Sequence, residues 1–159
     1  MKNILLFLIV ISPMFVFSQQ NRTLSHYYNN LSVINPSAIT MVDNTELKIN
    51  LRNQWNGFSE DKSVNAGVLT FNKFIKDKSF IGLEVNNDNT GNLANSSLLL
   101  KYGHLVELSN KSKLGFGLSG GMTNIYINEI SFLDAASVIN EQSWVPNANF
   151  GFSFFNDAG

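Results

Sequence analysis

Hydrophobic and polar residues alternate along the chain from Thr45 onward, with the two-residue period of a β-strand. In the first such run, residues 45–53, the side chains of Leu47, Ile49 and Leu51 fall on one face. The other face carries charged and polar side chains, namely Glu46, Lys48, Asn50 and Arg52. The pattern therefore predicts a strand that separates an apolar environment from a polar one.

The same alternation recurs and predicts six strands, over residues 45–53, 63–71, 79–86, 96–106, 113–126 and 148–155. It is clearest in 113–126, where bulky residues occupy the even positions and glycine or other small residues occupy the odd ones. We expect these glycines to let the strand bend or to let another backbone approach closely. In 63–71 the pattern leaves open whether Val64, Ala66 and Val68 or Leu69 and Phe71 form the apolar face.

The expected connections are residues 54–62, 72–78, 87–95, 107–112 and 127–147, loosely alternating between long and short. Transmembrane barrels have strands of about 9–11 residues, short periplasmic turns and longer external loops. With the N-terminus in the periplasm, 54–62, 87–95 and 127–147 would face outside. We therefore predict an all-β fold, an antiparallel up-and-down transmembrane β-barrel. A secreted β-sandwich shows the same alternation and stays open as an alternative.

Aromatic residues near the expected strand ends fit the girdles that mark membrane interfaces. Trp55, Phe58, Tyr126 and Trp144 would lie toward the outer rim, and Phe71 and Phe80 toward the inner one. On the polar face, Glu46, Lys48, Arg52 and Lys101 predict a polar lumen.

Six strands cannot close a bacterial barrel, whose strand count is even and begins at about eight. The last residues, Asn156 to Gly159, have the composition of a turn that starts another hairpin. An open sheet edge in lipid would leave backbone groups without partners. Residues 45–159 are therefore expected to form the N-terminal part of a longer barrel, with an independent six-stranded sheet domain as the alternative.

The first eighteen residues have the organisation of a cleavable signal peptide, residues 1–18. Lys2 precedes an apolar run from Ile4 to Ile11, which is much shorter than the ~20 residues of a spanning helix. The following residues, 19–44, are polar and form an expected lead-in loop. Within it, Pro36 disfavours helix at Asn35 and cannot donate to a sheet ladder. Because residues 1–18 are expected to be a signal for export, the mature protein is expected to leave the cytoplasm.

Composition excludes several classes of function. The chain has no cysteine, which excludes disulfides, thiolate metal sites, thiol nucleophiles and a lipid anchor on cysteine. Its formal net charge is −1 and it has no basic stripe, so nothing favours binding to nucleic acid. After the signal peptide there is no second long apolar run, so any contact with a membrane must be made by strands.

The residues with catalytic or metal-binding chemistry form no recognisable site. His26 and His104 are far apart and lack metal-ligand spacing. His104 could be paired with Ser119 on a neighbouring strand, but no third catalytic group is identifiable. The oxygen-rich run from Asn86 to Gly91 lacks the glutamate of a calcium loop and is expected to be a plain loop. We predict a non-enzymatic protein without cofactor or metal.

The densest group of side chains suited to recognition is the run from Arg52 to Phe58. It contains a guanidinium, three amides, an indole and a phenyl ring around Gly57, which is expected to adopt a backbone conformation that other residues resist. From composition alone it is a hairpin loop with Trp55 at the membrane boundary and Arg52 paired with Glu46 or another lumenal acid.

Several motifs in order resemble the start of the PorP/SprF family of type IX secretion system membrane proteins. They are Tyr27-Tyr28-Asn29, Ile34-Asn35-Pro36-Ser37-Ala38, Arg52-Asn53-Gln54-Trp55-Asn56-Gly57-Phe58, Ile81-Gly82-Leu83 with Asn87-Asp88 and Gly91, the run Leu114 to Gly121, and Pro146-Asn147 with Phe150-Gly151-Phe152. The chain departs from the family pattern at Ser37-Ala38-Ile39-Thr40 and in the loop after Phe58, which has no proline.

This resemblance implies an outer-membrane barrel of Bacteroidetes that works with the type IX secretion and gliding machinery. It would assist the export or surface retention of large adhesins, in contact with outer-membrane lipid, other machinery proteins and adhesin cargo. The family-motif residues, and candidates for partner binding, are Asn35, Pro36, Arg52, Asn53, Gln54, Trp55, Gly57 and Phe58. The alternative is a general diffusion channel, which should have a wide charged lumen, whereas an accessory protein would be plugged by bulky residues or by its own lead-in segment.

Overall fold

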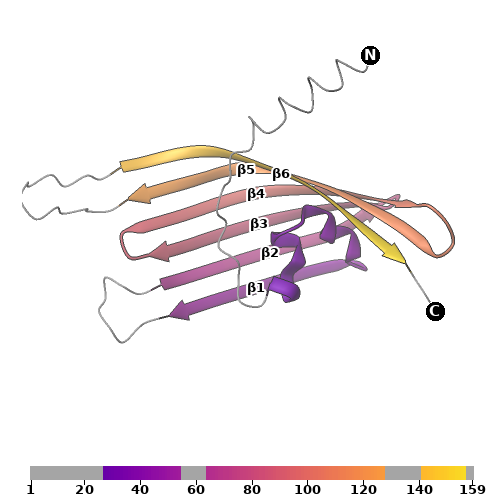
Figure 1. Cartoon of the computed structure of the whole chain (residues 1–159), viewed down its shortest axis with the longest axis horizontal. Helices are drawn as coiled ribbons and strands as arrows, with labels where there is room; N and C mark the ends of the chain where they lie inside the picture. Colours follow the sequence, from indigo (N-terminus) through magenta and orange to yellow (C-terminus); the bar gives the residue numbers. More distant parts are fainter. Residues whose placement is uncertain (1–26, 55–63, 128–140, 157–159) are drawn as a thin grey trace, which may run out of the picture.

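The computed structural model describes residues 27–54, 64–127 and 141–156, which form one antiparallel sheet and two short helices (Figure 1). The strands are β1 (Thr45–Gln54), β2 (Val64–Lys76), β3 (Ser79–Thr90), β4 (Leu93–Glu107), β5 (Ser112–Ile127) and β6 (Glu141–Asn156). Each strand pairs with its neighbours in the chain, in the order β1-β2-β3-β4-β5-β6. This confirms the all-β, up-and-down prediction. The six-stranded sheet is open, as a partial barrel would be.

All six expected strands are present, but most are longer than alternation indicated. The expected loop over 87–95 is wrong, because β3 continues to Thr90 and β4 begins at Leu93. Asn87, the first residue of the expected loop, belongs to the ladder because it lies opposite Gly67 of β2 and Ser96 of β4. Pairing on both sides outweighs the low β-propensity of an Asn-rich run.

The turns between the middle strands are tight. β2 and β3 are joined by Asp77 and Lys78, which have positive φ angles of 51° and 64°. β3 and β4 are joined at Gly91, whose φ is 53°. The long-and-short alternation of connections therefore fails in the middle of the sheet. The first and last connections, and the expected turn after Asn156, lie outside the described residues.

The register assigns every strand residue to one of two faces. Leu47 pairs with Phe71 and Ile49 pairs with Leu69, so Leu69 and Phe71 join the apolar face of β1. Val68 lies on the opposite face and is buried. The register thus decides which residues of β2 form its apolar face, a question that the sequence left open. We call the face of Leu47 the outer face and the face of Val68 the inner face.

The outer face is apolar and exposed across the sheet. Leu47, Ile49 and Leu51 are 61%, 61% and 84% exposed, and three phenylalanines of β6, namely Phe150, Phe152 and Phe154, are 60–66% exposed. Its other exposed apolar residues include Val85, Leu98, Leu100, Tyr102, Phe116, Leu118, Met122, Tyr126 and Trp144. Phe80, expected in an aromatic girdle, instead lies buried on the inner face against Phe74, with ring centroids 5.2 Å apart.

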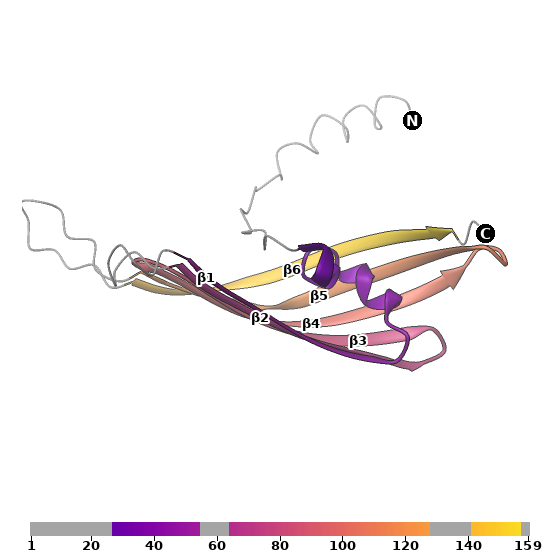
Figure 2. The same cartoon turned by 90° about the horizontal axis from the view of Figure 1, so that it is seen from below.

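Two 3₁₀-helices, η2 (Tyr27–Val33) and η3 (Pro36–Met41), pack on the inner face of the curved sheet (Figure 2). The expected lead-in loop is therefore partly helical. Asn35 is extended, as expected before proline, but Pro36 then opens η3, because proline suits the first turn of a helix. No helix among the described residues is long and apolar enough to cross a membrane. We call residues 27–41 the inner segment.

Candidate functional site

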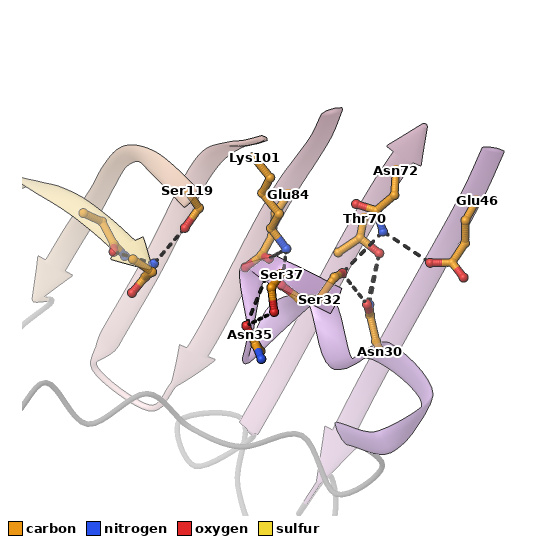
Figure 3. Close-up of polar contacts among 12 residues, drawn as sticks. Asn30, Ser32, Asn35, Ser37, Glu46, Thr70, Asn72, Glu84, Lys101 and Ser119 are labelled. Carbon is orange, nitrogen blue, oxygen red and sulfur yellow. Dashed lines mark hydrogen bonds and ion pairs between the residues drawn. The ribbon is translucent and has the colours of Figure 1, made fainter. Parts of the chain in front are cut away.

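The candidate site is the contact between the inner segment and the inner face of the sheet. Its side chains project from the strands toward η2 and η3 (Figure 3). The contact has a glycine floor under η3, a cluster of amides and hydroxyls under η2, and a buried ion pair between them.

Four inward-facing glycines form the floor under η3, which we call the glycine seat: Gly103 of β4, Gly115 and Gly117 of β5, and Gly151 of β6. A β carbon at Gly117 would collide with the backbone of Pro36 and Ser37, and one at Gly103 would lie 2.7 Å from Ile39 Cγ1. Real β carbons do not come this close to other atoms. Gly117 of β5 therefore permits the close approach of the η3 backbone, which is one of the two roles that the sequence suggested for the glycines of this strand.

Asn35 both caps η3 and ties it to β6. Its Oδ1 accepts hydrogen bonds from Ser37 N at 3.0 Å and from Ser37 Oγ at 2.7 Å. Its Nδ2 donates to Phe152 O at 3.1 Å and to Ser153 Oγ at 3.2 Å. The hydroxyls of Ser37 and Ser153 are themselves 2.6 Å apart. Two family-motif candidates, Asn35 and Pro36, therefore lie at the centre of the contact.

Under η2 the contact is made by amides and hydroxyls (Figure 3). Asn30 Nδ2 donates to Thr70 Oγ1 at 3.1 Å, and both residues are almost wholly buried. Asn72 Nδ2 donates to Ser32 Oγ at 3.4 Å and to Glu46 Oε1 at 3.2 Å. Asn30, Thr70 and Asn72 thus each have at least one hydrogen-bond partner, although Asn72 Oδ1 accepts no hydrogen bond.

A buried ion pair lies between these two groups of contacts. Lys101 Nζ of β4 is 2.5 Å from Glu84 Oε2 of β3, and the two side chains are 2% and 5% exposed. The same ammonium donates to the carbonyl oxygen of Ser32 in η2. Gly82, which lies opposite Lys101 in the ladder, leaves room for the lysine stem. A buried charge needs such partners, because its loss of hydration is otherwise uncompensated.

The sequence placed Lys101 in the lumen but missed its pairing with Glu84. Alternation puts Glu84 on the face opposite Leu83 and Val85, so the sequence alone could have placed Glu84 in the lumen with Lys101. The pairing itself depends on the register between β3 and β4, which puts Gly82 rather than Glu84 opposite Lys101.

The other family-motif candidates lie elsewhere. β1 ends with Arg52, Asn53 and Gln54. They lie at the opposite end of the strand from Thr45, where the chain enters β1 after the inner segment. Trp55, Gly57 and Phe58 lie outside the described residues. Arg52 was expected to pair with Glu46 or another lumenal acid, but among the described residues its Nη2 donates to Gln54 Oε1 at 2.7 Å. Glu46 instead pairs with Lys48 at 2.7 Å.

His104 cannot pair with Ser119, as the sequence alone would have allowed, because the two side chains lie on opposite faces of the sheet. His104 is on the outer face, 3.1 Å from Ser79 Oγ, whereas Ser119 is on the inner face and accepts from Asn149 at 3.1 Å. Within 27–54, 64–127 and 141–156, no group of three or more His, Asp or Glu residues could hold a metal ion. The chemistry of the candidate site is that of a docking site for a peptide segment.

A family model, type IX secretion system membrane protein PorP/SprF, matches residues 16–158, which is most of the chain. No curated protein and no solved structure matches the chain. The matched range includes the inner segment, its seat and all six strands. The chain therefore belongs to the PorP/SprF family of type IX secretion system membrane proteins.

Proposed function

We propose that this protein is a non-enzymatic outer-membrane component of the type IX secretion and gliding machinery that assists the export or surface retention of large adhesins. Its route to the outer membrane begins with the cleavable signal peptide at residues 1–18. Family membership supports the secretion role. The observation that carries the membrane assignment is the pair of unlike faces of the sheet.

The apolar outer face supports a barrel wall in lipid. In a β-sandwich the apolar faces of two sheets pack together about 10 Å apart. Here the face that is covered is the polar one, by the inner segment, while Leu51 and Phe152 on the other face are 84% and 66% exposed. An apolar face of this extent matches the outward-facing band of a transmembrane barrel.

The covered inner face favours an accessory protein over the alternative of a general diffusion channel. A water-filled channel keeps its lumenal charges solvated. The central charges of this wall, Lys101 and Glu84, are instead buried under η2. The inner segment also contacts five of the six strands, β2 to β6, through η3. This matches the expectation of a barrel plugged by its own lead-in segment.

Deletion of the gene in the native host tests the function. We expect adhesin on the cell surface, measured with antibody on intact cells, to fall at least tenfold while other outer-membrane proteins stay at normal levels. Purified protein in planar lipid bilayers should give no steady open-channel current. Unchanged adhesin display together with a large steady current would instead identify a diffusion channel.

Trp55 tests whether the run from Arg52 to Phe58 binds a partner. Large aromatic residues dominate binding interfaces, and loss of one such contact typically costs ~2 kcal/mol or more. We expect Trp55→Ala to reduce adhesin display severalfold while the amount of folded protein in the outer membrane stays nearly unchanged. Trp144→Ala is the matched control, since Trp144 is exposed on the outer face of β6. Equal loss of display and of folded protein for Trp55→Ala would make Trp55 a structural residue.

A further inference from the structure

We infer that the inner segment is a removable plug. It can leave the glycine seat while the six-stranded sheet, which we call the wall, stays intact. Three independent observations carry this inference: the segment contributes no strand to the sheet, the contact is mostly polar, and the buried charges stay paired when the segment leaves.

The inner segment contributes no strand to the six-stranded sheet. The ladders run from the pairing of Thr45 with Lys73 to that of Ile127 with Glu141, with one register shift between Phe74 and Lys76 at the β2–β3 turn. η2 and η3 lie on the face of this sheet and take no place in its strand order. Departure of the segment therefore breaks no strand-to-strand hydrogen bond.

The contact is mostly polar, so water can replace what the segment leaves behind. Asn30, Ser32, Asn35 and Ser37 meet the hydroxyls, amides and carbonyls of the wall. Among residues 29–41 of the segment, the buried apolar side chains are those of Pro36, Ala38 and Ile39. Its larger apolar side chains at 31, 34 and 41 are 39%, 51% and 53% exposed, so this wall gains little from burying them.

The buried ion pair stays paired when the segment leaves. Lys101 and Glu84 both belong to the wall, on the adjacent strands β3 and β4. The segment supplies one additional acceptor, the Ser32 carbonyl oxygen. Water entering the vacated face can take the place of that carbonyl, so removal leaves no charge without a partner.

A disulfide between the segment and the wall tests whether removal is needed for export. The hydroxyls of Ser37 and Ser153 are 2.6 Å apart, so cysteines at both positions would place their sulfurs close to bonding distance. The natural chain has no cysteine to compete. We expect cells with oxidised Ser37→Cys/Ser153→Cys protein to display at least tenfold less adhesin than the same cells after reductant. Oxidised Ser153→Cys alone is the control and should display normally. Normal display by the crosslinked protein would overturn the need for removal.

A second measurement does not rest on the proposed function. Thr70 is fully buried under Asn30, so a maleimide reagent reaches Thr70→Cys only after the segment leaves. We expect slow labelling of the folded protein, and at least tenfold faster labelling when Asn35→Asp is added. Aspartate keeps the cap on η3 but places an acceptor against the carbonyl of Phe152, where asparagine donates.

Heat-modifiable gel mobility verifies that both labelled variants are folded. Absence of labelling in the folded state of both, with full labelling after denaturation, would overturn the inference. Failure of the proposed function is distinguishable from this result, because it would appear as normal adhesin display in the deletion strain whatever the labelling rate.

Discussion

Gly117→Val is expected to expel the inner segment from its seat while the six-stranded wall stays folded. A β carbon at this position collides with backbone atoms of Pro36 and Ser37, which no change of side-chain rotamer can relieve. Overpacking of this kind costs about 1–3 kcal/mol, which is comparable to several of the hydrogen bonds that hold the segment. Strand propensity alone would instead predict that Gly117→Val stabilises the protein, since valine favours a strand over glycine.

The measurement is maleimide labelling in the Thr70→Cys background, with heat-modifiable mobility to verify the fold. Gly120→Val is the matched control, because Gly120 lies in the same strand on the outer face and a β carbon there would meet nothing within 4 Å. We expect Gly117→Val to be labelled at least tenfold faster than the parent and Gly120→Val at the parental rate. Parental labelling of Gly117→Val would mean that the glycine seat does not hold the segment.

Removing one partner of the Lys101–Glu84 pair is expected to destabilise the protein by about 3–5 kcal/mol, whereas removing both should cost less than either change alone. In Glu84→Leu the buried ammonium keeps only the carbonyl of Ser32, and in Lys101→Met the buried carboxylate loses its cation. The double variant leaves no buried charge. Denaturant unfolding in lipid vesicles measures all three free energies of unfolding and gives the coupling between the residues.

The exposed pair of Lys78 and Glu107 is the matched control. Its ammonium and carboxylate are 2.7 Å apart, but the side chains are 47% and 48% exposed. Exposed pairs contribute ~0–1 kcal/mol, so Lys78→Met and Glu107→Leu should have small effects that add. Additive losses at Lys101 and Glu84 would show that their charges are not buried together in the folded protein.

Much of the wall could be predicted from the sequence because side chains of a strand alternate with a fixed period. Leu47, Ile49 and Leu51 lie on the exposed apolar face as alternation indicated, and all six strands exist. The ends of the strands could not be predicted. Residues 87–90 have the composition of a loop, and only their partners on β2 and β4 make them part of a strand.

The sequence by itself determined the six strands, the apolar face of β1 and the family, because these depend on local periodicity and on motifs in order. It also suggested that another backbone could approach the glycines of β5. Only the tertiary structure decided which backbone this is, since Gly117 of β5 lies against the backbone of Pro36 and Ser37. The pairing of Lys101 with Glu84 was likewise decided by strand register. Contacts of this kind depend on how strands align and pack, which local patterns do not encode.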